Sequence, residues 1–316
     1  MLNIPADARW VQNAVTVAGG HGRGNDANQL LGPFGIYVDD DQTMVIADGG
    51  NHRIIRWKVG HANGEVVAGG NGSGIGLDQF SRPSDVLIDR QTNTYIICDY
   101  GNRRVVRWSR RSGTTQREIL LDNISCFGLA MDADNNLYIS DIQKHEVRRY
   151  QIGNKNGTLV AGGNGYGAGL NQLNYPYYFF VDQEQTVYVS DFENSRVMKW
   201  NKDATEGIVV AGGQGEGNAL TQLNCPQGLF VDALGTLYVA ESRNNRVTRW
   251  LKGAKYGTII LGGNDVGKEA NQFHWPVGLS FDRNGNLYVA DHYNLRVQQF
   301  SIKCANKHDS SFCVQQ

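Results

Sequence analysis

The sequence has no long apolar run and no excess of charge of either sign. No stretch approaches the roughly 18 consecutive apolar residues that a membrane-spanning helix requires, so we predict no membrane span. The 30 Lys and Arg residues nearly balance the 31 Asp and Glu residues, which leaves a net charge of −1. Nucleic-acid binding depends on basic surfaces that neutralise phosphates, so this balance argues against a nucleic-acid partner.

Two further absences narrow the fold and the chemistry. No window shows sustained helical periodicity, which excludes a protein built mainly from α-helices. The short signatures of common hydrolases, Gly-x-Ser-x-Gly and His-Glu-x-x-His, are missing, and no Cys/His pair lies at a useful spacing. We therefore expect no catalytic residue and no cofactor.

One ten-residue segment, by contrast, is present six times. Its first copy is Asp48-Gly-Gly-Asn-His-Arg-Ile-Ile-Arg-Trp57, and the spacing is about 50 residues except for one interval that is shorter by about eight. The copies begin at Asp48, Asp99, Asp141, Asp191, Glu241 and Asp291. A fixed period of this length is typical of solenoids, propellers and other repeat arrays.

Each copy belongs to a larger unit of four short apolar runs, which are rich in Val, Ile, Tyr and Trp and separated by Gly, Asn and Asp. Such runs between turn residues predict strands, and four antiparallel strands form one blade of a β-propeller. The unit starts at Pro33, Pro83, Cys126, Pro176, Pro226 and Pro276. The sequence therefore predicts an all-β fold, a six-bladed β-propeller of four-stranded blades.

The two ends of the repeat region predict how the ring closes. Residues 15–20 form a fourth strand with no blade before it, and residues 296–300 form a third strand with no fourth strand after it. We expect the N-terminal strand to pair with the last blade, because closure removes open sheet edges. The predicted parts of the chain are a lead-in of residues 1–13 with Trp10 as an anchor, a propeller of residues 14–303 and a C-terminal tail of residues 304–316.

The repeat resembles the NHL family of propellers. Asn51-His52-Arg53 and Asn294-Leu295-Arg296 correspond to the Asn-His-Leu element after which that family is named. The resemblance covers residues 14 to 300, and six copies in register make it specific for the fold. Propellers of one architecture host many unrelated functions, so the resemblance implies a fold and says little about function.

The five cysteines fall into two groups. Cys98, Cys126 and Cys225 lie at repeat positions, where we expect buried side chains that act as small hydrophobes. Cys304 and Cys313 bracket a polar segment of the tail, and a disulfide between them would hold a segment that otherwise frays. A bridge from the tail to one of the three inner cysteines is the alternative.

Possible modification sites bear on the compartment. Asn71, Asn123 and Asn156 each begin an Asn-x-Ser/Thr sequon in a predicted loop. Together with a tail disulfide, which needs an oxidising environment, they favour an extracellular glycoprotein. Residues 1–5 do not resemble a signal peptide, so we expect either a mature secreted form or, as the alternative, a cytoplasmic protein.

The candidate binding residues lie on one face of the ring. In a propeller, the loops from the fourth strand of one blade to the first strand of the next share a face with the loops between second and third strands. These loops hold the positions that vary while the frame repeats, and such positions often carry a binding site. The predicted binding residues at this mouth are Phe34, Asp85, Tyr100, Phe127, Tyr177, Tyr178, Phe192 and His292.

From these features we predict a non-enzymatic module for protein or glycan interaction or for assembly, including self-association. The resemblance leaves two alternatives open. The amidating lyase of peptide processing, a relative of this repeat class, holds zinc by histidines at the mouth. The candidates here are His274 and His292, whereas His52 and His145 occupy a repeat slot that is poorly suited to a metal. Other NHL propellers bind single-stranded RNA through a basic face.

Overall fold

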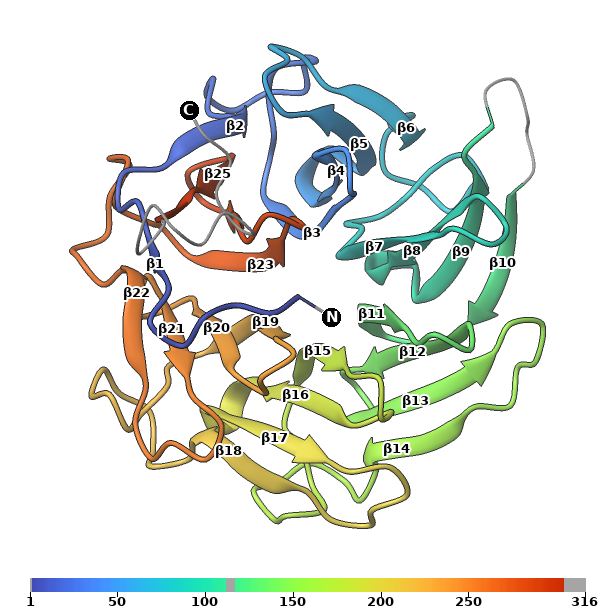
Figure 1. Cartoon of the computed structure of the whole chain (residues 1–316). Helices are drawn as coiled ribbons and strands as arrows, with labels where there is room; N and C mark the ends of the chain where they lie inside the picture. The colour runs from blue at the N-terminus through green and yellow to red at the C-terminus, as the bar shows by residue number, and fades with distance from the viewer. Residues whose placement is uncertain (1, 112–116, 304–316) are drawn as a thin grey trace.

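The computed structural model describes residues 2–111 and 117–303, which form six four-stranded antiparallel sheets around one axis (Figure 1). Each sheet is one blade, with its first strand at the axis and its fourth strand at the perimeter. The predicted six-bladed β-propeller is thereby confirmed. Within the described ranges, no helix is long and apolar enough to cross a membrane.

Consecutive strands of each blade are neighbours in its sheet. The inner strands are β3 (Pro33–Val38), β7 (Asp85–Asp89), β11 (Cys126–Met131), β15 (Pro176–Val181), β19 (Pro226–Val231) and β23 (Pro276–Phe281). The second strands are β4 (Thr43–Asp48), β8 (Thr94–Asp99), β12 (Asn136–Asp141), β16 (Val187–Asp191), β20 (Leu237–Glu241) and β24 (Leu287–Asp291). The third strands are β5 (Arg53–Lys58), β9 (Arg104–Ser109), β13 (Glu146–Gln151), β17 (Arg196–Trp200), β21 (Arg246–Trp250) and β25 (Arg296–Phe300).

The perimeter is made by the fourth strands. They are β6 (Glu65–Gly69), β10 (Arg117–Asp122), β14 (Thr158–Gly162), β18 (Ile208–Gly212), β22 (Thr258–Gly262) and, in the last blade, β2 (Val15–Gly19). Single 3₁₀ turns follow the second strands of three blades, at η1 (Gly49–Asn51), η2 (Tyr100–Asn102) and η3 (Phe192–Asn194).

The ring closes as predicted, because β2 pairs antiparallel with β25. The lead-in adds a second closure that the sequence did not predict, in which β1 (Arg9–Trp10) pairs with β26 (Ile302–Lys303). Trp10 is only 1% exposed, packs against Tyr238 and Phe281, and donates from its indole N–H to the Gly285 carbonyl at 2.9 Å. The lead-in is therefore held against the last two blades, with Trp10 as its anchor.

The hydrophobic core lies between neighbouring blades. One aromatic side chain near the end of each third strand is buried there: Trp57, Trp108, Tyr150, Trp200, Trp250 and Phe300. Trp57 of the first blade, for example, shares a cluster with Tyr288 and Val297 of the last blade. Burial of such large rings is worth a few kcal/mol each, about 2–3 by area, and it makes every blade depend on its neighbour.

A buried ion pair recurs in five blades and fixes the loops on one face. In the first blade Arg53 donates to Asp48 at 2.8 Å, and the same guanidinium donates to the backbone carbonyls of Asn25 and Gln29. Equivalent contacts are made by Arg104, Arg196, Arg246 and Arg296. Each arginine thus holds the Gly-rich loop that precedes its own blade.

Blade 3 lacks both the loop and the arginine. Only residues 123–125 connect β10 to β11, whereas residues 163–175 connect β14 to β15. Glu146 occupies the arginine position and accepts from Arg148 of the same strand at 2.7 Å. Because there is no loop to hold, the residue that holds it in the other blades is absent too.

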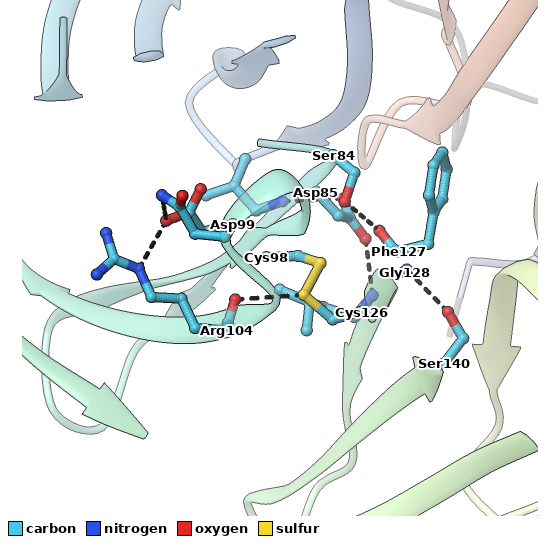
Figure 2. Close-up of a disulfide and its surroundings, with 12 residues drawn as sticks. Ser84, Asp85, Cys98, Asp99, Arg104, Cys126, Phe127, Gly128 and Ser140 are labelled. Atoms are coloured by element: carbon cyan, nitrogen blue, oxygen red, sulfur yellow. Dashed lines mark hydrogen bonds and ion pairs between the residues drawn. A yellow bond between two sulfur atoms is a disulfide. The ribbon is translucent and has the colours of Figure 1, made fainter. Parts of the chain in front are cut away.

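A disulfide joins blades 2 and 3 at this junction (Figure 2). It links Cys98 of β8 to Cys126 at the start of β11, and both side chains are fully buried. The expectation that these two cysteines are merely small hydrophobes is therefore wrong, whereas Cys225 is free and buried as expected. The predicted pair of Cys304 and Cys313 lies outside the described residues.

We predict that this disulfide compensates for the missing loop. Replacing Cys98 and Cys126 together with Ala should lower the free energy of unfolding by about 2–4 kcal/mol, because the cross-link restricts the unfolded chain. Urea unfolding measured with and without reductant checks this. The wild type should shift to the stability of the double variant under reductant, and the double variant should not respond. An unchanged midpoint for fully reduced wild type would contradict it.

A second prediction concerns the buried ion pairs. Arg246→Ala leaves Glu241 buried without its cation, so the free energy of unfolding should fall by about 3–5 kcal/mol. Arg243, three residues earlier, pairs with Glu216 on the surface, with both side chains about half exposed. Arg243→Ala is the matched control and should cost at most about 1 kcal/mol. If both variants lose the same free energy of unfolding in urea, the buried ion pair stabilises the fold no more than the surface pair does.

Candidate interaction site at the mouth of the propeller

The mouth of the propeller is formed by the Gly-rich loops together with the turns that follow the second strands. The two kinds of segment contact each other directly. In the first blade the Gly50 N–H donates to the Leu31 carbonyl at 2.8 Å, and in the second the Gly101 N–H donates to the Ser81 carbonyl at 2.7 Å. The Gly-rich loops and the turns after the second strands therefore lie on one face of the ring, as predicted.

The third residue of each repeat unit, counted from Pro33, Pro83, Cys126, Pro176, Pro226 or Pro276, lies where neighbouring inner strands come close together. A Cβ atom at Gly278 would lie 2.3 Å from the Phe34 carbonyl oxygen, and one at Gly228 would lie 2.5 Å from the Val277 carbonyl oxygen. These positions therefore require glycine. The two blades that depart from glycine carry Asp85 and Tyr178, which line an axial cavity of about 110 Å³.

Both departures are buried inside the ring. Tyr178 is 7% exposed and donates its hydroxyl to the Ser84 carbonyl at 3.0 Å. Asp85 is 8% exposed and accepts the N–H groups of Val86 and Leu129 at 2.9 and 2.8 Å. The Ser84 hydroxyl also donates to the Phe127 carbonyl across the same junction (Figure 2). Asp85 and Tyr178 thus tie blades together from within, and neither side chain is open to a ligand at the surface.

The Asp85 carboxylate has no cationic partner among residues 2–111 and 117–303. Burial raises its pKa to about 7, and the two backbone N–H groups lower the pKa only in part. In the unfolded chain the pKa of this group returns to 3.8. Between these two values the folded state binds more protons than the unfolded state, so stability falls as pH rises from about 4 to about 7.

We predict that Asp85 contributes a distinct part of the pH dependence of stability. The control is Asp85→Gly, which restores the residue found at this position in most other blades. Between pH 5 and pH 8 the free energy of unfolding of the wild type should fall by about 2 kcal/mol more than that of Asp85→Gly. The other buried acids are present in both proteins, so their contributions to the pH dependence cancel when the two proteins are compared. If urea unfolding shows that the free energies of unfolding of the two proteins change with pH in parallel, Asp85 does not contribute to the pH dependence of stability.

Seven of the eight predicted binding residues, all except Asp85, form one aromatic cluster at the mouth, and Tyr178 joins it from the axis at 5.3 Å from Phe127. Phe127 stacks on Tyr177 at 4.3 Å between ring centroids, and Tyr177 contacts Phe192 at 4.4 Å. Phe34 contacts Phe127 at 5.8 Å and His292 at 4.6 Å. Tyr100 completes the cluster at 5.7 Å from Phe127. The prediction that they bind a ligand stays a prediction.

The cluster continues at both ends into rings that were not among the predicted binding residues. On one side Tyr177 leads through Tyr175 and His145 to Tyr166, with centroid distances of 6.4, 5.3 and 5.8 Å. On the other side His292 contacts Tyr293 at 4.8 Å. We call the whole set the aromatic stripe: Phe34, Tyr100, Phe127, His145, Tyr166, Tyr175, Tyr177, Phe192, His274, Trp275, His292 and Tyr293.

The stripe is buried at its centre and exposed at its ends. Phe127 and Phe192 are under 10% exposed, whereas Tyr166 is 73%, Tyr175 42% and Tyr293 54% exposed. A signal for Tyr293 was present in the sequence, because the corresponding residue is Gly, Gln, Glu or Arg in the other five blades. The short connection before blade 3 also leaves the rim low beside Tyr100 and Phe127.

The histidines of the second-to-third turns link blades. Nδ1 of His52 accepts the Arg82 N–H at 3.1 Å, and Nδ1 of His145 accepts the Tyr175 N–H at 3.2 Å. Nδ1 of both rings is therefore engaged in a backbone hydrogen bond to the loop before the next blade. His292 contacts the Pro33 carbonyl through Nδ1 at 3.1 Å, and burial lowers its pKa. Within residues 2–111 and 117–303, no three His, Cys, Asp or Glu side chains are grouped so as to hold a metal ion.

The three sequon asparagines are all exposed. Asn71 lies in a Gly-rich loop, Asn123 in the short connection before blade 3, and Asn156 in the turn between β13 and β14. Their positions leave each side chain accessible, and glycosylation at them stays a prediction.

Fold and repeat together define the class of this protein, a six-bladed β-propeller. A family model for the NHL repeat matches residues 223–250 and 273–300, in the last two blades. The last two blades of this six-bladed propeller therefore carry NHL repeats, as the resemblance implied. A search of curated protein sequences finds no significant match.

Solved structures share the fold at low identity. An auxiliary nutrient binding protein from Bacteroides thetaiotaomicron is 14% identical, with a TM-score of 0.72 over 94% of this chain and 78% of that protein. A gluconolactonase from Xanthomonas campestris is 14% identical, with a TM-score of 0.64 over 95% and 99%. A chain of a nidogen/laminin complex is 17% identical, with a TM-score of 0.58 over 87% and 86%. These likenesses show the fold alone.

Proposed function

We propose that this protein is a non-enzymatic, extracellular interaction module that binds a protein or glycan partner through the aromatic stripe. The observation that carries the proposal is the continuity of the stripe, which crosses the mouth from Tyr166 to Tyr293 and ends in exposed rings on both sides. Exposed Tyr and Trp side chains are enriched at binding surfaces, because they supply contact area at a small cost in side-chain entropy.

The geometry of the mouth favours surface recognition over enclosure of a small molecule. Small-molecule pockets usually have about 300–1,000 Å³, and the axial cavity of about 110 Å³ is much smaller. Tyr178 and Asp85 line the narrow axis below the stripe, so a partner would contact the exposed rings at the two ends of the stripe. A broad partner, such as a protein segment or a glycan chain, suits such a platform.

The disulfide and the exposed sequons support an extracellular location. Cys98–Cys126 joins two blades in the folded core, and disulfides of this structural kind persist mainly in oxidising compartments. Asn71, Asn123 and Asn156 are all exposed, as glycosylation would require.

The central test uses a matched pair of variants. Tyr166→Ala with Tyr293→Ala removes both exposed ends of the stripe, and Tyr256→Ala removes a ring that is 65% exposed on the opposite face. We expect ligands found on peptide and glycan arrays to bind the stripe variant about tenfold or more weakly, a loss of 1.4 kcal/mol or more. Binding by Tyr256→Ala should match the wild type, and all melting temperatures should agree within about 2 °C.

Array ligands that bind both variants equally well would place the interaction elsewhere and overturn the proposal. The rival function, a metal-dependent lyase or hydrolase at the same mouth, has a different signature. It requires a stoichiometric metal that is lost in His274→Ala or His292→Ala, which elemental analysis of protein from its natural source would detect. Salt-sensitive binding to single-stranded RNA would instead favour the nucleic-acid alternative.

A further inference from the structure

We propose that a groove between blades 4 and 5, on the face opposite the mouth, binds an acidic segment of a protein that carries large apolar side chains. This inference goes beyond the proposed function, because the groove shares no residue with the aromatic stripe. Three features of the groove lead to it: its elongated shape, two leucines that depart from the repeat, and lysines that have no ion pair.

The groove lies where the hairpin turns of two neighbouring blades meet, and it has a volume of about 600 Å³. We call it the blade 4–5 groove, and its lining includes Lys199, Lys202, Leu234, Trp250, Leu251 and Lys252. A second groove of about 800 Å³ runs along β18, the edge strand of blade 4 (Figure 1).

The two grooves form one path from the face to the perimeter. Both are lined by Val210, Trp250 and Gly253, so they meet over the Trp250 ring. An edge strand leaves backbone groups free to pair with an added peptide strand. The path therefore suits an extended chain that lies along β18 and continues onto the face.

The exposed apolar side chains of the blade 4–5 groove are Leu234 and Leu251, which are 48% and 44% exposed. The residues that correspond to Leu234 in the other five blades are Asp41, Gln91, Asp134, Glu184 and Asn284. Those that correspond to Leu251 are Lys58, Ser109, Gln151, Asn201 and Ser301. Every other blade has a polar residue at both positions, so the fold does not require leucine there. Two exposed leucines at one groove indicate a surface that a partner covers.

The walls of the groove are held in place before a partner binds. The Ala233 N–H donates to the Leu2 carbonyl at 2.8 Å, so the lead-in fixes the turn that presents Leu234. The Trp250 indole N–H donates to the Thr248 hydroxyl at 3.2 Å, so the ring has no free polar group. A preorganised surface of this kind loses little entropy on binding.

The lysines give the rim of the groove its charge. Lys199, Lys202 and Lys252 make no ion pair with residues 2–111 or 117–303, and Lys199 lies over the Tyr188 ring at 5.6 Å. Lys202 and Lys252 are exposed. Carboxylates of a partner complement such a rim, whereas a basic segment is repelled by it.

Three acidic residues also line the groove, and two of them are used within hairpin turns. Asp232 is 1% exposed and accepts three hydrogen bonds inside its own hairpin. Asp182 is half-buried and accepts the Thr186 N–H at 2.8 Å. Glu184 is thus the one exposed acid against three lysines. The exposed charge at the groove is mainly positive, although the chain as a whole has a net charge of −1.

The neighbouring junction shows that this charge is not a general property of the propeller. Between blades 3 and 4 a perimeter groove of about 550 Å³ is lined by Asp203 and Glu206 together with Arg149. In the groove along β18, Lys255 is the only charged lining residue among those that the structure describes, and Gly253 takes the place of Asp203. Of the two junctions, the one between blades 4 and 5 is therefore suited to an acidic segment.

Titration calorimetry on the whole chain tests the inference with a peptide of about eight alternating Glu and Leu residues, and with the same peptide in which Lys replaces every Glu. We expect only the acidic peptide to bind. Its dissociation constant should rise about tenfold or more in Leu234→Asn/Leu251→Asn, since Asn is the residue that blades 6 and 4 have at these positions. Leu170→Asn/Leu220→Asn is the matched control, because these leucines are 47% and 44% exposed outside the groove, and it should bind as the wild type does.

The contribution of charge is tested with a second matched pair. Lys202→Glu/Lys252→Glu should weaken binding of the acidic peptide about tenfold or more. Lys58→Glu/Lys268→Glu makes the same change of charge on exposed lysines elsewhere and should alter binding by less than about twofold. Raising the salt concentration from about 0.05 M to about 0.5 M should weaken binding several-fold, because salt screens contacts between carboxylates and lysines. All melting temperatures should agree within about 2 °C.

Four outcomes would overturn the inference. The acidic peptide does not bind the wild type, or it binds the groove variants and the controls equally, so that its site is elsewhere. The basic peptide binds as well as the acidic one, so that the lysines do not select the partner. Octanoate binds and the groove variants lose it, while the peptide does not bind, which would identify a site for small amphipathic anions. Tyr166→Ala/Tyr293→Ala should leave the affinity for the acidic peptide unchanged, so this inference and the proposed function stand or fail separately.

Discussion

The buried pairing of an acidic residue with an arginine is the interaction on which the mouth of this propeller depends. In five blades the guanidinium neutralises a carboxylate that is almost inaccessible to water, and its remaining N–H groups bind backbone carbonyls of the preceding loop. A loop rich in glycine has a high conformational entropy when free. One arginine with several fixed acceptors makes such a loop part of the rigid frame.

Blade 3 supports this dependence, because it lacks both the arginine and the loop that the arginine would hold. The loop is lost, the arginine is replaced by Glu146, and the junction with blade 2 is joined by a disulfide and by side-chain bonds from Ser84 and Asp85. The disulfide and these hydrogen bonds thus join blades 2 and 3 inside the ring, at the junction where the Gly-rich loop is missing. The ring therefore stays closed, although the mouth is lower beside Tyr100 and Phe127 because the loop is absent there.

The repeat made most of the fold predictable from sequence. Blade number, strand number and the closing strand all follow from periodicity, because each unit must bury its faces against the next one. The disulfide was not predictable in the same way. Cys98 and Cys126 are separated by 28 residues, and only the folded ring brings their Cα atoms to 5.8 Å. The pairing of β1 with β26 also depends on contacts between distant ends of the chain.

The site was predictable in part. Positions that depart from the repeat identified the central rings, but departure from glycine does not distinguish a surface residue from one that fills the axis. Asp85 and Tyr178 are of the second kind, since both side chains are buried among the inner strands and are only 8% and 7% exposed. Tyr293 could have been found by the same comparison of blades, whereas Tyr166 lies in a loop whose contacts depend on the assembled mouth.

Covalent labelling of tyrosine, read by mass spectrometry on protein isolated with its natural partner, tests the central claim most directly. The account predicts that Tyr166, Tyr175 and Tyr293 become protected when the partner is bound, while Tyr256, exposed on the opposite face, is labelled to the same extent with and without it. Protection of Tyr256 with unchanged labelling of the other three would contradict the assignment of the mouth as the interaction surface.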